Sequence, residues 1–261
     1  MAFFRGTFLS EVLECETSLQ VMIPWDLYDF RTHDRYGRCD KTLILLHGLR
    51  QSGDDWIRMT NVARYAEELG FCLVIPELQR SFCTDMRYGM RYFTYITQEL
   101  SGVVDALFKI PVDRAHLYVG GLSMGGFGAL KCALKYPERY AGAICLSSAL
   151  YHLLKPEVCL GDSAAYGRGE LQGILGIDLQ ASGDEDLRHL AQLASGSEYK
   201  PAVYMSCGDQ DCNYGENMEM CRHLEQLGFP ARFEGCAGGH YWDVWDTGIR
   251  RGMEYMLNQK Q

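Results

Sequence analysis

The sequence predicts an α/β fold in which a mostly parallel central sheet is covered by helices on both faces. Strand-like and helix-like segments alternate along most of the 261 residues, which is the pattern of parallel strands joined by crossover helices. Several strand-like segments are continuous apolar runs, such as TLILLHG at 42–48, and such runs suit strands that are buried on both faces. The composition, 47% hydrophobic and 23% charged, is that of an ordinary globular domain.

The elements follow in chain order from these patterns. Residues 7–23 alternate and are rich in β-formers, so two antiparallel strands are expected there, followed by a polar connecting loop over 24–41. The next expected strands are 42–48, 71–77, 115–121 and 141–149, and the helices between them are 55–69, 92–108 and 124–137. Gly70 and Pro137 are the stop signals of two of these helices.

Residues 150–200 break this rhythm, because they carry several glycines and one short helical stretch, around 184–194. Strands at 201–209 and 231–239 and helices at 215–227 and 241–258 then resume it. No Pro/Ser-rich linker divides the chain. We therefore expect residues 1–261 to form a single domain with a cap-like insertion at about 150–200.

The charge and the cysteines limit the function classes. The formal net charge of −9 argues against a nucleic-acid partner and against an anionic membrane surface. The start of the chain lacks the pattern of a signal peptide, and no stretch reaches 18 apolar residues, so a cytoplasmic protein is expected. The eleven scattered cysteines contain no CxxC pair, which predicts reduced thiols, and nothing in the sequence requires a metal or another cofactor.

The strongest chemical signal is Gly121-Leu122-Ser123-Met124-Gly125, between an expected strand and an expected helix. This is the context of a nucleophile elbow, in which a sharp turn exposes the serine oxygen above the carboxyl ends of the strands. The alternative is a glycine-rich helix start with a capping serine. Ser123 is thus the candidate nucleophile.

A base and an acid are expected later in the chain, in the order Ser, acid, His. His240, in GCAGGHYWDVW before the last helix, is the candidate base, and the alternative is a structural histidine that caps that helix. Of the other histidines after Ser123, His189 and His223 lie within expected helices, and His152 opens the insertion without a strand-end position. The candidate acid is Asp211 in CGDQD, with Asp209 as its competitor.

The backbone N–H groups of Leu49 and Met124 are the expected oxyanion donors, because Gly48 lets the chain turn after its strand and Met124 opens a helix. His47 is interpreted as a residue that orders this loop. The aromatic residues Trp56, Tyr88, Trp242 and Trp245 flank the expected site in the sequence, either as a substrate clamp or as core residues.

The segments LLHG, DDWIRMTNVARYA, VIPE, CTDMRYGMRYFTYITQEL, GGLSMGGFGALKCAL, CGDQD with Asn217 downstream, and GGHYWDVWD together resemble the esterase D branch of the α/β hydrolases. The match is closest to bacterial tributyrin esterases and their acetyl- and feruloyl-esterase relatives, and S-formylglutathione hydrolases belong to the same branch. It spans about residues 5–257 and is weakest over 150–200. Where the family has a longer glycine-bearing loop after HG, this chain has Arg50-Gln51-Ser52-Gly53.

The resemblance implies an α/β-hydrolase fold and a serine carboxylesterase with Ser123, Asp211 and His240 as triad. It also implies a homo-oligomer, since relatives are often dimers or tetramers. The expected reaction is two-step acyl transfer on a small ester with a short acyl or aryl group. The alternatives are an esterase acting on acetylated or feruloylated plant oligosaccharides, an S-formylglutathione hydrolase, and a hydrolase-like binding protein without activity.

Overall fold

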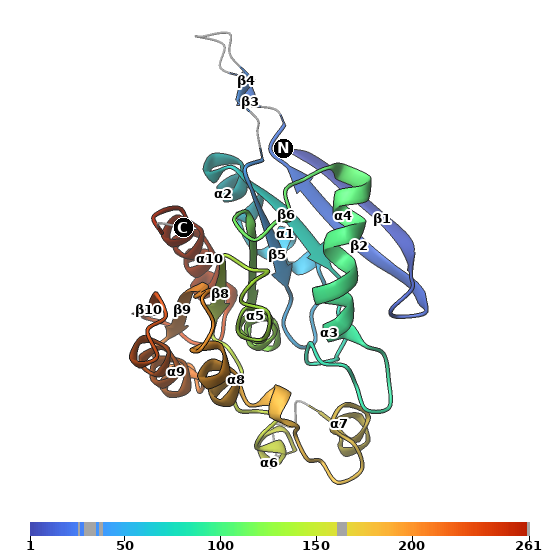
Figure 1. The fold of residues 1–261 in the computed structure, drawn as a ribbon, viewed down its shortest axis with the longest axis vertical. Helices are drawn as coiled ribbons and strands as arrows, with labels where there is room; N and C mark the ends of the chain where they lie inside the picture. Colours follow the sequence, from blue (N-terminus) through green and yellow to red (C-terminus); the bar gives the residue numbers. More distant parts are fainter. Residues whose placement is uncertain (26, 29–34, 37–38, 161–165, 260–261) are drawn as a thin grey trace.

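The computed structural model describes residues 1–25, 27–28, 35–36, 39–160 and 166–259. Its centre is an eight-stranded sheet in the order β1-β2-β6-β5-β7-β8-β9-β10 (Figure 1). The strands are β1 (Ala2–Ser10), β2 (Cys15–Ile23), β5 (Lys41–Leu46), β6 (Phe71–Pro76), β7 (Leu117–Leu122), β8 (Gly142–Leu146), β9 (Ala202–Gly208) and β10 (Ala231–Cys236). β1 and β2 pair antiparallel, β2 also runs antiparallel to β6, and every later pairing is parallel. The predicted mostly parallel sheet is confirmed.

Helices cover both faces of this sheet and bury two separate apolar layers. Side chains of α1 (Asp54–Met59), α2 (Val62–Leu69) and α10 (Trp242–Leu257) pack with Leu43 and Leu45 of β5. Side chains of α4 (Leu100–Phe108), α5 (Met124–Lys135) and α9 (Tyr214–Gln226) pack with Ile44 and Leu46, the alternate positions of the same strand. Because neighbouring strand residues point to opposite faces, residues 43–46 of β5 are all apolar.

Two helices expected as single units are interrupted. The predicted helix 55–69 is split into α1 and α2 because Thr60 is extended, with φ of −135°. Its hydroxyl donates to the carbonyl of Trp56, and the N–H of Asn61 donates to Asp246 Oδ1 at 2.7 Å. The expected helix 92–108 comprises α3 (Tyr92–Thr94), a π-helical turn (Tyr95–Glu99) and α4.

The N-terminal region differs from the prediction in its extent. β1 begins at Ala2, five residues earlier than the expected start at residue 7. Within the predicted loop 24–41, two short strands, β3 (Leu27–Tyr28) and β4 (Arg35–Tyr36), pair antiparallel in a projection away from the sheet (Figure 1). Residues 26, 29–34 and 37–38 of that loop lie outside the described residues.

The insertion between β8 and β9 is more helical than expected. It contains α6 (Pro156–Cys159), α7 (Arg168–Leu175), a 3₁₀ turn (Gly183–Glu185) and α8 (Leu187–Ala194). Ion pairs attach it to the rest of the chain: Glu170 binds Arg80, Asp184 binds Lys135, and Glu185 Oε1 lies 3.1 Å from Lys131 Nζ. These links hold α7 and the 3₁₀ turn, and α6 and α7 lie at the end of the molecule beyond the sheet (Figure 1).

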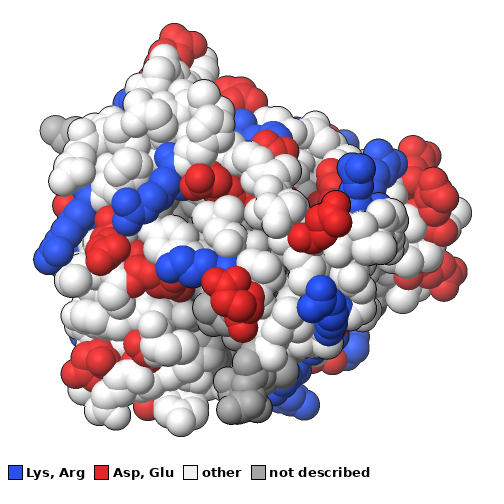
Figure 2. Space-filling model, turned by 90° about the horizontal axis from the view of Figure 1, so that it is seen from below, with Lys and Arg blue, Asp and Glu red and all other residues white. Residues whose placement is uncertain are grey.

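The face that includes this end carries lysines and arginines interleaved with acidic residues (Figure 2). No single sign of charge covers it, so it has no uniform field to steer an ionic substrate. Separately, no helix in the described part of the chain is long and apolar enough to span a membrane.

The cysteines require one correction. Cys39 and Cys72 form a disulfide with Cα atoms 5.5 Å apart, so the prediction of reduced thiols throughout is wrong for this pair. The disulfide ties the segment before β5 to β6. Of the nine free cysteines, six are buried and pack as small apolar side chains.

Candidate active site

Ser123 occupies a strained turn between β7 and α5. Its φ is 53° and its ψ −115°, a region that non-glycine residues rarely adopt. Three backbone hydrogen bonds hold it there: its N–H donates to Leu146 O at 2.8 Å, and its carbonyl accepts from the N–H groups of Phe127 and Ala149, each at 3.1 Å. The backbone of Ser123 is thus held by the end of β8 and the residues after it, and by the first turn of α5.

Close backbone approach explains the glycines on both sides of the serine. A Cβ on Gly121 would lie 2.4 Å from the backbone of Gly125, and a Cβ on Gly125 would lie 2.2 Å from Leu46 O. Both clashes involve backbone atoms, which cannot rotate away. Only glycine therefore lets β5, β7 and α5 meet at this point.

We expect Gly125→Ala to abolish soluble expression or to lower the free energy of unfolding by more than about 3 kcal/mol, because β5 or α5 must shift. The control is Gly102→Ala in α4, where an added Cβ meets nothing within 4 Å. It should stabilise the protein by about 0.5–1 kcal/mol through helix propensity. Urea unfolding measures both changes. Equal stabilities for the two variants would contradict the close packing described at the turn.

His240 lies after β10, immediately before α10. Its Nε2 is 3.0 Å from Ser123 Oγ, and its Nδ1 is 2.7 Å from Asp211 Oδ2. The Trp245 ring packs perpendicular to the imidazole with centroids 4.9 Å apart, and the His240 side chain keeps 37% of its surface exposed. The histidine is therefore oriented from two sides and still open to a substrate.

Asp211 follows β9, and its side chain is completely buried. Burial raises the pKa of this carboxyl, but the hydrogen bonds from His240, the Asn213 N–H and the Ser147 hydroxyl outweigh it, so the pKa lies below its ordinary value. Asp209 is exposed instead and accepts the N–H of Gly238 at 3.1 Å. Of the two candidates, only Asp211 contacts His240 in the described part of the chain.

The predicted oxyanion donors meet at the same place. Leu49 and Met124 both line the pocket that contains Ser123 and His240. Their N–H groups donate to no acceptor in the described residues, so both remain available to a substrate oxygen. His47 is fully buried and orders the loop: its Nδ1 lies 2.8 Å from Gly48 O, and its Nε2 lies 3.0 Å from the N of Leu78 and 2.9 Å from Glu77 Oε1.

The pocket over Ser123 has a volume of about 410 Å³ and combines residues that are far apart in the sequence. Its lining residues are Leu49, Arg50, Phe82, Ser123, Met124, Ala149, His152, Tyr166, Cys212, Asn213 and His240. More of its exposed lining is apolar than polar. A small ester with an apolar part fits this chemistry.

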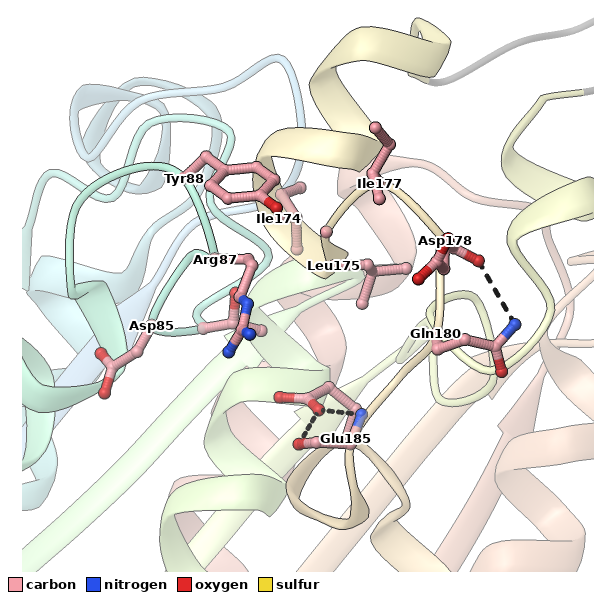
Figure 3. A pocket seen from close by; sticks show the side chains of 12 residues that line it. Asp85, Arg87, Tyr88, Ile174, Leu175, Ile177, Asp178, Gln180 and Glu185 are labelled. Atoms are coloured by element: carbon pink, nitrogen blue, oxygen red, sulfur yellow. Dashed lines mark hydrogen bonds between the residues drawn. The ribbon is translucent and has the colours of Figure 1, made fainter.

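The four aromatic candidates do not line this pocket. Trp56 has no exposed surface and Trp245 is 3% exposed, and Trp242 packs edge-on against both of them. These tryptophans belong to the layer under α10, where Trp245 packs against His240, so the substrate-clamp alternative does not apply to them. Tyr88 is 66% exposed but lines a different pocket, between residues 84–88 and the end of α7, which does not include Ser123 (Figure 3).

The sequence patterns missed Phe82, Tyr166 and His152 as pocket residues. Tyr166 is held by its hydroxyl, 3.4 Å from Arg80 O, and by the Arg80 guanidinium over its ring. Arg80 in turn binds Glu170 of α7. No local spacing relates these positions, because the insertion reaches the pocket through tertiary ion pairs.

Glu216, at the start of α9, lies close to the acid. The pKa of Glu216 is raised to about 7, mainly by burial and also by repulsion from the Asp211 and Glu219 carboxylates. The Leu150 N–H and the Lys155 charge act in the opposite direction and lower the pKa. Since the folded pKa is above the unfolded one, the stability linked to this group is present below about pH 4.5. It is lost as the pH rises through about 7.

We therefore expect Glu216→Gln to raise the free energy of unfolding at pH 8 by about 1–2 kcal/mol, after a discount for partial solvent exposure, and to change it little at pH 5. The matched control is Glu219→Gln on the exposed side of the same helix, which should show no such pH dependence. Chemical unfolding at both pH values measures the effect. A stabilisation of Glu216→Gln that is equal at both pH values would contradict it.

Within the described residues, no group of three or more His, Cys, Asp or Glu side chains is arranged to hold a metal ion. What the site does offer is one hydrogen-bonded chain from Ser123 through His240 to Asp211, at the carboxyl ends of β7, β9 and β10. A serine on a strand–helix turn, joined in this way to a histidine and an acid over a mostly parallel sheet, defines the serine class of α/β hydrolases.

Comparison with known proteins gives the family. Residues 10–252 match the family described as "Putative esterase", and the chain belongs to it. The chain is 30% identical to the acetyl esterase of Caldicellulosiruptor saccharolyticus over 98% of both sequences. It superposes on FphF, a fluorophosphonate-binding serine hydrolase of Staphylococcus aureus, with a TM-score of 0.84, 28% identity and 99% of both chains covered. It also superposes on the S-formylglutathione hydrolase FrmB of the same organism, with a TM-score of 0.83, 28% identity and 98% and 99% of the chains covered. The predicted α/β-hydrolase fold of the esterase D type and the predicted serine carboxylic ester hydrolase are confirmed.

Proposed function

We propose that Ser123, His240 and Asp211 are the catalytic triad and that the enzyme hydrolyses small esters with short acyl groups. The observation that carries this proposal is the pair of hydrogen bonds on His240, at 3.0 Å to Ser123 and 2.7 Å to Asp211. The geometry lets Nε2 remove the serine proton while Nδ1–H stays bound to a carboxylate.

The proposed reaction has two halves. His240 accepts the proton of Ser123 as Oγ attacks the ester carbonyl, and the N–H groups of Leu49 and Met124 stabilise the tetrahedral oxyanion. The alcohol leaves with the proton from His240. Water, activated by the same histidine, then releases the acid from Ser123. The ionised Asp211 stabilises the imidazolium in both halves.

The proposed substrate range follows from the size of the pocket. About 410 Å³ accommodates a short acyl group with a small alcohol, and a long acyl chain would extend into solvent. The name of the 30% identical relative, an acetyl esterase, supports this range. The likeness to the S-formylglutathione hydrolase FrmB favours S-formylglutathione as a second candidate substrate. Esters of plant oligosaccharides remain the third alternative.

A substrate panel tests this range. We expect the kcat/KM of the wild-type enzyme to be higher for p-nitrophenyl acetate and butyrate than for the laurate ester, because the pocket binds only the short groups. S-formylglutathione, ethyl ferulate and acetylated xylo-oligosaccharides complete the panel. A kcat/KM for one of these three that exceeds the acetate value at least tenfold would replace the proposed substrate class.

We also propose a cap role for about 150–200, a cytoplasmic location and a homo-oligomer. The cap role is supported by Tyr166 and His152 of this insertion, which line the pocket. The nine free cysteines support a reducing compartment such as the cytoplasm, whereas the Cys39–Cys72 disulfide favours an oxidising one. The oligomer rests on the family resemblance, and β1 exposes Phe3, Phe4 and Leu9 at the edge of the sheet. Light scattering of the purified chain tests the oligomer.

A further inference from the structure

We propose that His152 binds a neutral hydrogen-bonding substituent of the substrate and so makes the enzyme prefer hydroxyl- or amide-bearing small esters over plain alkyl esters. This inference deepens the proposed ester hydrolysis and rests on it. In the sequence, His152 lacks the strand-end position that a catalytic base requires. The structure places it in the site for a different reason.

His152 lines the same pocket as Ser123 and His240. It stands at the start of the insertion, shortly after β8, and its carbonyl accepts a hydrogen bond from Cys159 Sγ at 3.6 Å, which fixes the local backbone. Its ring lies against Phe82, with centroids 6.3 Å apart and planes at 32°. The imidazole is therefore positioned by packing, within reach of a group bound at the serine.

The ring nitrogens of His152 have no hydrogen-bond partner in the described part of the chain. Burial lowers the pKa of His152, and the nearby His240 lowers it further, against a weaker opposite effect of Asp211. The ring is thus a neutral imidazole with one N–H donor and one acceptor nitrogen. The side chain is half-buried in the pocket wall, so a ligand bound there can complete the hydrogen bonds of these two nitrogens.

The other uncharged polar side chains of the pocket already have partners. The Asn213 amide donates to Ser147 O at 3.1 Å and accepts from Cys212 Sγ, while the Tyr166 hydroxyl lies within hydrogen-bonding distance of Arg80 O. Among the lining residues that the structure describes, His152 therefore differs from Asn213 and Tyr166 in having both of its polar atoms unused. A neutral imidazole suits a neutral partner, either a hydroxyl or an amide. Such a group sits on the acyl side or on the alcohol side of the ester.

Matched pairs of esters distinguish these two sides. On the alcohol side, 2-hydroxyethyl acetate is compared with propyl acetate, and on the acyl side methyl glycolate is compared with methyl propionate. Each pair exchanges a hydroxyl for a methyl group of similar size. For each pair, the fold-change in kcat/KM that a substitution at residue 152 causes for the hydroxyl ester is divided by the fold-change for the alkyl ester. This ratio is independent of the intrinsic reactivity of the two esters.

We expect His152→Phe to lower kcat/KM for the hydroxyl member of one pair about 3- to 10-fold more than for its alkyl partner, mainly through KM, and His152→Gln to restore part of the difference. The responding pair identifies the side that His152 contacts. A structural role would lower both members of each pair equally. The control is His189→Phe on the exposed side of α8, which should leave all ratios unchanged. Ratios within twofold of one for both pairs would overturn the proposal.

A readout without turnover separates this proposal from the catalytic one. In Ser123→Ala, the ring ¹⁵N signals of His152 should shift on titration with the hydroxyl member of the responding pair and stay unchanged with its alkyl partner. If wild type hydrolyses no ester and is not labelled by a fluorophosphonate, the proposed function fails. If wild type is active and labelled but neither hydroxyl ester shifts the His152 signals, only the role of His152 fails.

Discussion

Ser123→Ala should lower kcat/KM for p-nitrophenyl acetate by at least about 10⁴-fold. The serine oxygen is the atom that would form the acyl bond, and the remaining oxyanion donors and the pocket supply only residual catalysis. The fold should persist, because the hydrogen bonds that hold residue 123 in its strained conformation come from its backbone N–H and carbonyl. Initial-rate kinetics with a thermal unfolding curve for each preparation measure both effects.

The matched control is Ser197→Ala, three residues beyond the end of α8 and not among the pocket residues, which should retain the wild-type rate. If a folded Ser123→Ala keeps more than about one hundredth of the wild-type kcat/KM, another nucleophile carries the reaction, and the proposed triad is wrong.

Asp211→Asn should lower kcat by about 10⁴-fold, whereas Asp209→Asn should change it less than about threefold. Asparagine keeps the shape of the side chain but cannot stabilise an imidazolium, and its amide can hold His240 in the wrong tautomer. In the part of the chain that the structure describes, the Asp209 carboxylate accepts the Gly238 N–H, a bond that the asparagine oxygen can keep. The two variants, assayed side by side, decide between the two carboxylates of the CGDQD segment.

The stabilities of the same pair give a second check. Because the pKa of Asp211 is below its ordinary value in the folded state, its carboxylate stabilises the fold above about pH 4, and this contribution is lost as the pH falls through the folded pKa. The stability difference between wild type and Asp211→Asn should therefore shrink on acidification. A larger kinetic loss in Asp209→Asn than in Asp211→Asn would overturn the assignment of the acid.

The sheet could be predicted because its strands carry their own signal. Residues 43–46 and 71–76 are buried throughout, and each is a continuous apolar run in the sequence. The insertion carries no such signal: α7 contains Gly169 and Gly173, and ion pairs to Arg80, Lys131 and Lys135 hold the insertion in place. Such contacts between distant segments produce no periodic pattern in the sequence, so they could not be predicted from it.

The three residues proposed as the triad could be located because each one follows a strand and the chain order is characteristic of the fold. The pocket walls could not be located in this way. Trp56 and Trp245 are near site residues in the sequence but face the layer under α10, while Tyr166 lies far away in the sequence and reaches the pocket. The Cys39–Cys72 disulfide was missed for a similar reason, since 33 residues separate its partners and only the pairing of β5 with β6 brings them together.

The central claim is that Ser123 carries the acyl group between the two halves of the reaction. Rapid acid quenching of the enzyme with excess p-nitrophenyl acetate, followed by mass spectrometry of its peptides, tests this claim directly. We predict one acetyl group on the peptide that contains Ser123, absent from the same peptide of Ser123→Ala and accumulated in Asp211→Asn if deacylation slows more than acylation. Acetylation of another residue, at a rate that matches the steady-state turnover, would contradict the mechanism.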